Sequence, residues 1–372
     1  MMQTQFRQDR QTNCSTDPLL LNLKMIERAE RRLRDVVHLT PLERNRTFSE
    51  MCGGELYLKY ENQQKTGSFK IRGAYNKICE LKEQGALDRI VAASAGNHAQ
   101  GVAFAASALG VQATIVMPKS TPIAKVKATE QYGAEVCLFG DCYDAAYEKA
   151  LEIQQEENSI FIHPFDDLSV MAGQATIGKE ILKAVPGVDA ILLPAGGGGL
   201  LAGVASYIKA TNPRIRIIGV QAEGAPAIKE AYYGHKTNIL HASTIADGIA
   251  VKVPGQKTQE VINRCVDEMV TVSDAEISSA ILLLLERTKQ VVEPAGAASL
   301  AAVLSGKVDV KDRSAVCVLS GGNIDVSVIH RIIEIGLLSR HRKLKFRTVM
   351  PDKPGSLERF SKIMADAFAN IV

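Results

Sequence analysis

The sequence predicts an α/β protein built from two open, mostly parallel, twisted sheets. Short apolar, β-branched runs alternate with longer helical patterns along most of the 372 residues, which is typical of parallel βα units. The alternation appears once in the first half of the chain and again in the second half, so we expect two sheets rather than one. With 46% hydrophobic and 23% charged residues, the chain can bury large cores in two or three domains.

The expected strands of the first sheet read "RIVAASA", "QATIVMP" and "AEVCLFG", and each is bounded by turn residues. Helical patterns lie between them, in "NHAQGVAFAASALG" and "TPIAKVKATEQYG". The second sheet is expected from "DAILLPAGGGG", "IRIIGVQAEG" and "SAVCVLSGGN". Ligands of open α/β sheets bind beyond the carboxyl ends of the strands, so the loops that follow these runs are where we expect a site.

Charge and composition exclude several classes of partner. The formal net charge of +3 gives no general attraction to nucleic acid or to an anionic membrane, so a small-molecule partner is favoured. The seven cysteines are scattered, odd in number and without a C-x-x-C pair, which indicates a reducing cytoplasm and no zinc site. We expect no signal peptide and no transmembrane segment, and residues 1–18 read as a flexible polar tail.

The strand "AILLP" leads into four consecutive glycines, Gly196, Gly197, Gly198 and Gly199, and then into a helical pattern. Residues without a Cβ let backbone N–H groups close around an anion at a helix N-terminus, where the helix dipole also favours negative charge. The alternative is a flexible turn, which four entropically costly glycines disfavour. We therefore expect a phosphate-binding loop here.

Two further loops follow strands. In "SAGNHAQG", the N–H groups of a helix start, with Ser94, Asn97 and Gln100, suit a substrate carboxylate. His98 in this loop could be a base, but a packed, hydrogen-bonded histidine is the favoured interpretation because the motif has no acidic neighbour. In "LSGGN", the hydroxyl of Ser320 could hydrogen-bond a ring nitrogen, although the motif would also suit an ordinary turn.

The segment "KTGSFKIRGA" places Lys70 directly after Phe69. A lysine is usually a solvated side chain, and the segment alone does not indicate chemistry. Together with a phosphate loop, a carboxylate-binding loop and a serine that faces a ring, it describes a pyridoxal phosphate enzyme that acts on an amino acid. In such enzymes a lysine amine holds the cofactor aldehyde as a Schiff base, and the cofactor is the electron sink.

Five motifs in order, "KTGSFKIRGA", "SAGNHAQG", "GGGGLLAG", "VEPAGAAS" and "LSGGNID", closely resemble the threonine dehydratase (threonine ammonia-lyase) family of the tryptophan synthase β group. The resemblance covers residues 19–340 and implies the fold type II of pyridoxal phosphate enzymes. It implies a large domain over residues 19–62 and 163–340 and a small domain over 63–162. It also implies a homo-oligomer, either a dimer or a tetramer.

The resemblance assigns roles to individual residues of this sequence. Lys70 matches the Schiff-base lysine and Phe69 the residue that lies along the cofactor ring, while Asn97 matches the partner of the ring hydroxyl and Ser320 that of the pyridine nitrogen. The four glycines match the phosphate loop. The substrate-carboxylate loop of the family matches Ser94, Ala95, Gly96, Asn97 and His98. Glu293 lies in a family motif, but a Glu before Pro at a helix start can equally serve the helix dipole.

The implied reaction is α,β-elimination of L-threonine, and of L-serine, to 2-oxobutanoate or pyruvate and ammonia. We expect the freed Lys70 amine to remove the Cα proton, and the cofactor phosphate to protonate the departing hydroxyl as the resemblance implies. A neutral serine at the ring nitrogen makes the ring a moderate electron sink, which favours elimination over transamination. A lowered pKa of Lys70 would suit its role as a base.

The sequence also bears on other activities of the same fold. Serine racemases carry a second serine in the "SAGN" loop, where this chain has Ala95, so a serine racemase is disfavoured and a serine dehydratase stays open. They also hold a divalent ion near the segment that here reads "QAEGAPAIKE". Glu223 could be a ligand there, but Lys229 replaces a carboxylate, so we predict no divalent site.

A nicotinamide dehydrogenase is a much weaker alternative. Gly197, Gly199 and Ala202 fit G-x-G-x-x-[GA], and Glu223 follows at about the right distance for a dinucleotide-binding unit. That interpretation leaves Lys70 and Ser320 without a role.

The C-terminal residues 341–372 resemble the first part of an ACT domain, a ligand-sensing module. "LKFRTVMPDKPGSLERFSKIMADAFANIV" predicts a strand, a Pro-Gly turn and an amphipathic helix, about half of the βαββαβ fold. We expect this partial module to leave apolar surface to be covered, and an allosteric small-molecule effector is a further hypothesis. The effector would decide between isoleucine biosynthesis and threonine catabolism. "SDAE", Ser273–Glu276, reads as a helix capping box.

Overall fold

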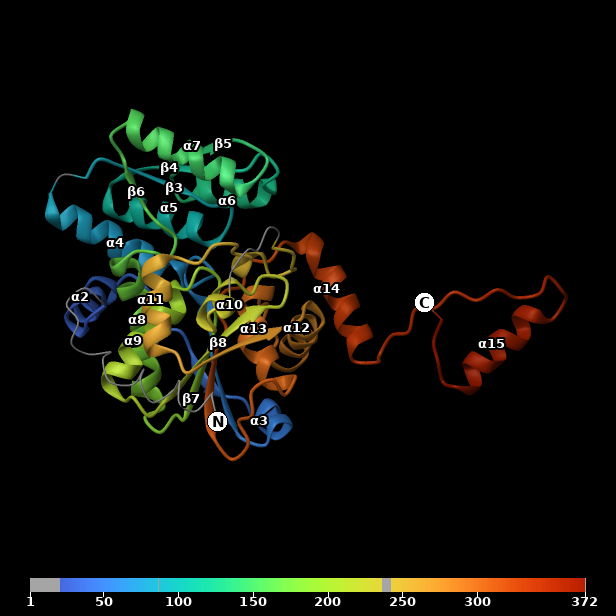
Figure 1. The fold of residues 1–372 in the computed structure, drawn as a ribbon. Coiled ribbons are helices and arrows are strands. Elements are labelled where there is room, and N and C mark those ends of the chain that lie inside the picture. Colours follow the sequence, from blue (N-terminus) through green and yellow to red (C-terminus); the bar gives the residue numbers. More distant parts are fainter. Residues whose placement is uncertain (1–20, 86, 236–241, 372) are drawn as a thin grey trace.

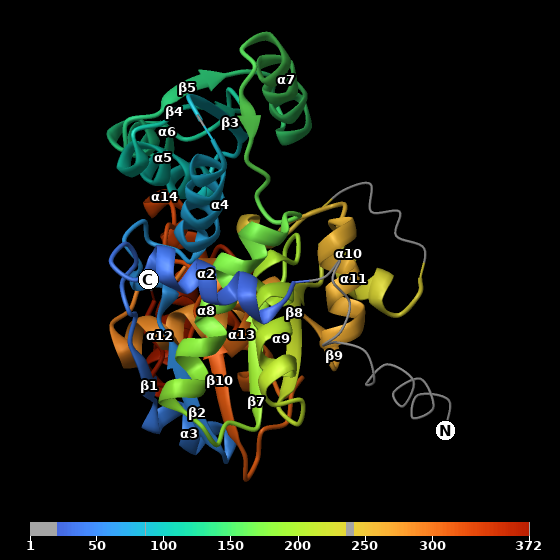
Figure 2. The same cartoon turned by 90° about the vertical axis from the view of Figure 1, so that its left-hand side faces the viewer.

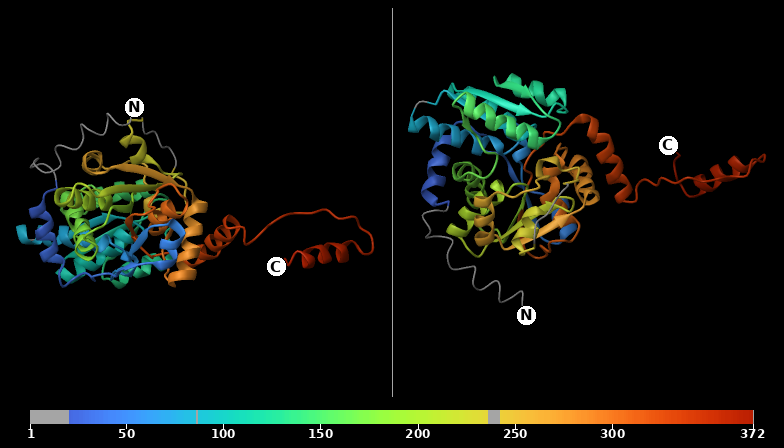
Figure 3. Two further views of the ribbon diagram at one scale, coloured as in Figure 1. Left: turned by 90° about the horizontal axis from the view of Figure 1, so that it is seen from below. Right: turned by 45° about the horizontal axis from the view of Figure 1, so that its top comes forward.

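The computed structural model describes residues 21–85, 87–235 and 242–371, and the tail expected over residues 1–18 lies outside them. The described residues form two lobes, with the smaller one above the larger one in Figure 1. A C-terminal extension projects to one side of the larger lobe (Figures 1 and 3). Two parallel-rich sheets, one in each lobe, confirm the predicted fold class.

The larger sheet has six described strands in the order β1-β2-β10-β7-β8-β9. All neighbours are parallel except β1, which pairs antiparallel with β2. The bounds are β1 Leu42–Arg44, β2 Glu55–Lys59, β7 Ala190–Pro194, β8 Arg216–Ala222, β9 Glu268–Val272 and β10 Ser314–Val318. Every residue of β7 is buried, which explains its unbroken apolar sequence in the middle of a covered sheet.

The smaller sheet is fully parallel, in the order β5-β4-β3-β6. The bounds are β3 Arg89–Ala93, β4 Gln112–Met117, β5 Glu135–Leu138 and β6 Ile160–Phe161. All four strands lie within residues 63–162.

Helices cover both faces of each sheet (Figure 2). The larger lobe carries α2 Leu23–Leu33, α3 Arg46–Cys52, α8 Leu168–Ala184, α9 Gly199–Thr211, α10 Ala227–Tyr232, α11 Gln256–Cys265, α12 Asp274–Thr288, α13 Pro294–Leu304, α14 Val326–Ser339 and the 3-10 turns η1 Glu61–Gln63 and η2 Asp247–Ile249. The smaller lobe carries α4 Lys70–Gln84, α5 Asn97–Leu109, α6 Ile123–Gln131 and α7 Tyr143–Glu156. The capping box predicted at Ser273 is present, with Glu276 as its partner.

Alternate residues of the strands feed separate cores on the two faces of each sheet. In the larger lobe, Leu192 and Ile218 pack with α12 and α13, whereas Ile191 and Ile217 pack with α2, α8, α9 and α11. In the smaller lobe, one face packs against α4 and α5 and the other against α7. With both faces of each sheet covered, the strand ends are left for the loops that form the site.

A buried charge cluster ties the start of α4 to the larger lobe. Arg72 is fully buried and donates two hydrogen bonds to Glu61, at 2.8 and 2.9 Å, and others to Glu180, the shortest at 2.6 Å. Lys59, also buried, donates to Glu180 at 2.5 Å. The charges of two cations and two carboxylates therefore balance in this cluster, and its Arg72 lies two residues after Lys70.

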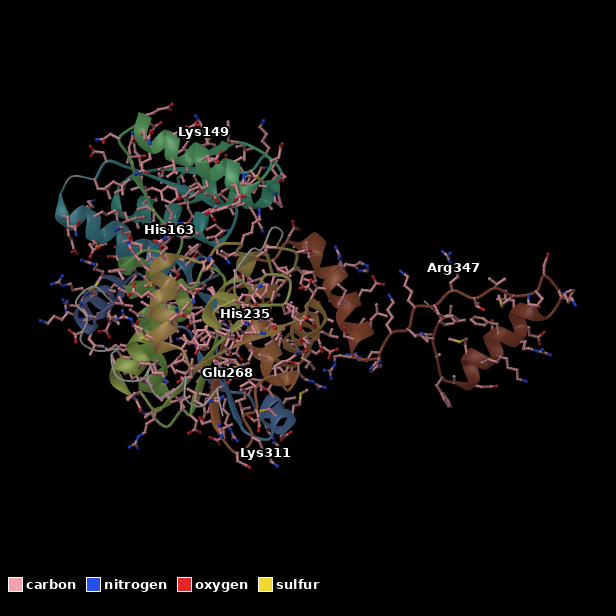
Figure 4. All side chains as sticks on the ribbon, viewed as in Figure 1. Lys149, His163, His235, Glu268, Lys311 and Arg347 are labelled. Atoms are coloured by element: carbon pink, nitrogen blue, oxygen red, sulfur yellow. The ribbon has the colours of Figure 1, made fainter. Side chains whose placement is uncertain are left out.

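The prediction of a strand in the C-terminal extension is wrong. Residues 344–350 carry no strand, because a strand needs a hydrogen-bonded partner and the described chain places none beside them. The expected helix is present as α15, Ser356–Asp366, but none of its residues is buried. Phe346 and Phe360 contact each other, with ring centroids 6.1 Å apart, and Figure 4 shows Arg347 on the same extension, away from both lobes.

Candidate active site

The carboxyl ends of three strands bring the predicted loops to the same edge of the lobes. The glycine loop follows β7, Ser320 follows β10 and Ser94 follows β3. Lys70 enters from the segment that follows β2 and stands at the first position of α4. The βα topology thus places all the predicted motifs where open α/β sheets bind ligands.

Contacts join these motifs into a closed circuit. Lys70 Nζ donates to the carbonyl of Pro164 at 2.9 Å, and Phe165 packs on the glycine loop. A Cβ at Gly196 would lie 3.0 Å from the carbonyl oxygen of Gly248, which lies beside Glu293. These contacts form one half of the circuit.

The other half runs from Glu293 back to Lys70. Asn97 donates to Glu293, and Glu293 lies against Gly321. Ser320 is buried, and its carbonyl accepts a hydrogen bond of 3.1 Å from the N–H of Phe69, the residue before Lys70. Residues from widely separated parts of the sequence, such as Phe69 and Ser320, therefore surround one location.

The glycine loop has the conformation and the free donors that an anion requires. Gly198 has φ +94° and ends the loop at the N-terminus of α9, with no side-chain cap. Within the described chain, the N–H groups of Gly196, Gly197, Gly198 and Gly199 donate no backbone hydrogen bond. Four unpaired donors at the positive end of a 13-residue helix fit a phosphate group.

Gly198→Ala is expected to destabilise the protein and loosen the loop. A Cβ there would lie 2.8 Å from the side chain of Ile262 and 3.0 Å from Thr258, and the left-handed φ is itself strained for alanine. We expect a loss of roughly 1–3 kcal/mol in the free energy of unfolding, measured by urea denaturation. Gly187→Ala is the control, because nothing lies within 4 Å of its Cβ position and its φ is not in the left-handed region. Equal stability of the two variants would contradict the expected strain.

Lys70 is a half-buried amine with an altered acidity. Burial lowers its pKa to about 8, although the negative field of Glu293 opposes the shift. Its Nζ also lies 5.3 Å from the centroid of the Phe69 ring. A lysine with a pKa near 8 is unprotonated often enough at neutral pH to act as a base or nucleophile.

This pKa predicts how Lys70 reacts in the protein without a cofactor. Because only the free amine is nucleophilic, acylation of Lys70 should rise with pH around a midpoint near 8 rather than near the ordinary 10.5. Competitive labelling between pH 6 and 11, read by mass spectrometry on the peptide that carries Lys70, measures the midpoint. The exposed Lys127 in the same digest corrects for the pH dependence of the reagent. A Lys70 midpoint above pH 10 would contradict the lowered pKa.

The loop from Ser94 to His98 forms the N-terminus of α5. Ser94 Oγ accepts a hydrogen bond of 3.2 Å from the N–H of Gly96, and Ser94, Ala95, Gly96 and Asn97 remain partly exposed. His98 instead turns inward and is buried, with Nε2 2.9 Å from the carbonyl oxygen of Ile162. Burial lowers the pKa of His98 to about 3, so its ring is neutral. The structure agrees with a packed histidine, and only the backbone of His98 can face a substrate.

Glu293 does not cap the helix that it begins. It is the N-cap of α13, yet its side chain makes no capping hydrogen bond and instead accepts from Asn97 Nδ2 at 2.7 Å. Burial, helped by Asp247, raises the pKa of Glu293 to about 7. Its side chain therefore belongs to the site rather than to the helix.

Several residues at the site were not predicted from the sequence. Asn323 donates to Asn97, and Pro164 accepts from Lys70. His163 lies where the two lobes meet (Figure 4), and its Nδ1 accepts from the N–H of Asp166 at 2.8 Å. The only sequence signal for His163 and Pro164 was their place in "HPFDD", shortly after a strand.

The residues fit pyridoxal 5′-phosphate. The unpaired N–H groups suit its phosphate, and the amine of Lys70 suits its aldehyde. Two buried hydroxyls in the segment that leads into Lys70, those of Thr66 and Ser68, make no hydrogen bond within the described chain. Unpaired buried polar atoms of this kind are expected where a polar ligand belongs.

The segment considered for a divalent ion holds mixed charges. Glu223 lies 3.7 Å from Lys307, and Lys229 donates to Thr271 at 3.2 Å. Among the described residues, no cluster of three or more His, Cys, Asp or Glu side chains is arranged to hold a metal. None of the helices in residues 21–85, 87–235 and 242–371 is both long and apolar enough to span a bilayer.

Comparison with known proteins found one family model and several similar enzymes. A family model described as pyridoxal-phosphate dependent enzyme matches residues 33–321. The L-threonine ammonia-lyase of Thermotoga maritima is 50% identical over 354 residues, which cover 95% of this chain and 88% of that protein. The catabolic L-threonine dehydratase of Escherichia coli K12 is 46% identical, over 82% of this chain and 93% of that protein.

A solved structure agrees with these relatives. The processed form of threonine deaminase isoform 2 from Solanum lycopersicum superposes with a TM-score of 0.82 at 36% identity. The match covers 87% of this chain and 90% of that one. The likeness therefore spans both lobes.

Proposed function

The chain belongs to the pyridoxal-phosphate-dependent enzymes, and from that premise we propose that it is an L-threonine ammonia-lyase. It dehydrates and deaminates L-threonine to 2-oxobutanoate and ammonia, and it accepts L-serine by the same chemistry. The observation that carries this proposal is the circuit of contacts that joins Lys70 to the glycine loop, Asn97 and Ser320. That circuit provides a partner for each polar part of the cofactor.

We propose that the residues matched by resemblance hold the cofactor. The four glycine N–H groups would bind its phosphate, Asn97 the ring oxygen, Ser320 the ring nitrogen and Lys70 the aldehyde, with Phe69 beside the ring. When bound, pyridoxal 5′-phosphate supplies an electron sink for the charge that develops on the substrate Cα. The neutral hydroxyl of Ser320 keeps that sink moderate, which favours loss of the β-substituent.

Lys70 would take the proton from the substrate Cα at its Nζ. Its pKa of about 8 leaves about a tenth of the amine unprotonated at pH 7, and the Pro164 carbonyl orients one of its hydrogens. The first turn of α5 would bind the substrate carboxylate through backbone N–H groups that have no intrahelical partner. The neutral ring of His98 adds no charge there.

Ala95 supports elimination over racemisation. A racemase needs a second acid or base on the face of the substrate opposite to Lys70, and alanine at this loop position supplies neither. We therefore propose a lyase without appreciable racemase activity.

The test is product analysis with the purified holoenzyme. Incubation with L-threonine should give 2-oxobutanoate and ammonia in equal amounts, and L-serine should give pyruvate. Rates with both substrates rank them, since one methyl group is worth only about 1–3 kcal/mol of discrimination. Recovery of unreacted or racemised threonine without any keto acid would refute the proposal.

We further propose that the enzyme works in the cytoplasm as a homo-oligomer, either a dimer or a tetramer. The domain limits, residues 19–62 with 163–340 and residues 63–162, are part of the same proposal. Residues 341–372 are proposed as a partial ACT-like regulatory segment. Isothermal titration of isoleucine, valine and nucleotides against the full chain would test whether that segment binds an effector.

A further inference from the structure

Three side chains form a hydrogen-bonded line across the site. Asn323 Nδ2 donates to the backbone carbonyl of Thr66 at 2.7 Å and to Asn97 Oδ1 at 2.7 Å. Asn97 Nδ2 in turn donates to Glu293 Oε1 at 2.7 Å. The line begins at the backbone carbonyl of Thr66 and ends at the buried carboxyl group of Glu293.

The backbone carbonyl at one end determines the polarity of the whole line. A carbonyl oxygen only accepts, so the atom of Asn323 that faces Thr66 must be its NH2 group. That NH2 group also faces Asn97, so the Asn97 atom nearest to it must be the amide oxygen. The NH2 group of Asn97 is thereby directed toward Glu293, which accepts one of its two hydrogens. The second hydrogen remains available to a ligand.

We infer that Glu293 is a positioning residue that, together with Asn323, holds the Asn97 amide in the orientation that presents an N–H donor to the cofactor. This inference rests on the proposed function, in which Asn97 faces the ring oxygen of pyridoxal 5′-phosphate. That oxygen is an acceptor when it is ionised, and a reversed amide would present a second acceptor to it. Glu293 thus acts through Asn97 rather than on the reacting atoms.

The surroundings of Glu293 favour this role over a purely structural one. Its side chain leaves its own helix uncapped, and it is packed so closely against Gly321 that a Cβ at that position would overlap Oε1. The charged groups whose fields act on it are Asp247, Lys125 and Lys70, with Asp247 opposing its ionisation. Whether or not the carboxyl group is ionised, one of its oxygens can accept from Asn97, so glutamine is a close replacement.

The experiment compares two replacements of Glu293. Glu293→Gln keeps an acceptor for Asn97, and its affinity for pyridoxal 5′-phosphate should stay within about threefold of the parent. Glu293→Leu keeps the bulk but leaves the Asn97 N–H without a partner, and the affinity should fall about tenfold to a hundredfold. Titration of the full-length apo-protein with cofactor, followed by the visible absorption of the holoenzyme, gives both affinities.

A second variant tests the other end of the line. Asn323→Asp is nearly isosteric but cannot donate to the Thr66 carbonyl or to Asn97, so it should reverse the Asn97 amide and lower the cofactor affinity at least about tenfold. Ser273→Ala is the stability control, because it removes the capping box of α12 and leaves the line intact. It should lower the thermal midpoint while the cofactor affinity stays within about twofold.

The outcomes separate this inference from the proposed function. If the parent protein binds the cofactor and deaminates threonine, but Glu293→Leu binds the cofactor as tightly as the parent, the positioning role is wrong. An equal loss in Glu293→Gln and Glu293→Leu would also refute it, because the conservative change should rescue. A parent protein that neither binds the cofactor nor forms a keto acid would overturn the proposed function itself.

Discussion

Lys70→Ala is expected to reduce threonine deamination at least about a thousandfold. The variant removes the amine that takes the Cα proton, and a positioned general base alone contributes roughly 10²–10⁴-fold. It also removes the nucleophile that captures the cofactor aldehyde. Steady-state formation of 2-oxobutanoate measures the loss, and mass spectrometry after borohydride treatment measures the adduct on the peptide that contains residue 70.

Two comparisons make this result specific to Lys70. Lys127→Ala removes an exposed lysine of α6 and should keep the parental rate and the adduct. The Lys70→Ala variant should keep its fold, since among the described residues Nζ donates to one carbonyl, that of Pro164 at 2.9 Å. Deamination by the alanine variant near the native rate, or a borohydride adduct on a different lysine of the parent, would exclude Lys70 as the catalytic amine.

Arg72→Met is expected to lower the free energy of unfolding by about 3–5 kcal/mol. Breaking a buried ion pair by removing one partner leaves uncompensated charge in the interior, and such changes are strongly destabilising. Here the buried Glu61 and the nearby Glu180 would be left with Lys59 as the remaining cation of the cluster. Urea denaturation of both proteins measures the difference.

The destabilisation should depend on pH. Despite its burial, the pKa of Glu61 is held below its ordinary value of 4.5, mainly by Arg72. A carboxyl group with a lowered folded pKa stabilises the protein above its unfolded pKa and loses that contribution as the pH falls. The gap between parent and Arg72→Met should therefore be largest near neutral pH and shrink below about pH 4.5.

A surface ion pair provides the control for Arg72. Arg46 and Glu50 form an exposed pair at 2.8 Å, four residues apart on α3. Screening by solvent makes such pairs worth little, so Arg46→Met should match the parent within the error of the measurement. If Arg72→Met were as stable as Arg46→Met, the cluster would not hold the start of α4 in place.

Much of the architecture could be predicted because its signals are local. The run "AILLP" predicts a strand, and "SDAE" predicts a helix start; both are present, as β7 and at the start of α12. The strand expected within residues 344–350 failed for the opposite reason. Its apolar residues have the pattern of a strand, but a strand exists only beside a partner.

The site residues also divide into those with a local sequence signal and those whose role depends on distant partners. Lys70 and the glycine loop stood out because their residue types are unusual in their local setting, and the structure brings them together. The sequence left Glu293 open between a site residue and a helix-start residue, because a Glu before Pro suits both. Asn323 did not stand out, since an Asn after two glycines is ordinary in a turn. Their importance depends on Asn97, which lies more than 190 positions away from either residue.

The sequence by itself determined most of the elements, where their strands end and which residue types reach those ends, because these properties follow mainly from neighbours within a few turns of chain. Only the tertiary structure decided the acidity of Lys70 and of Glu293, the hydrogen-bond partner of His98 and the orientation of the Asn97 amide. Burial and hydrogen-bond polarity are set by groups that meet only after folding, so no local pattern could specify them.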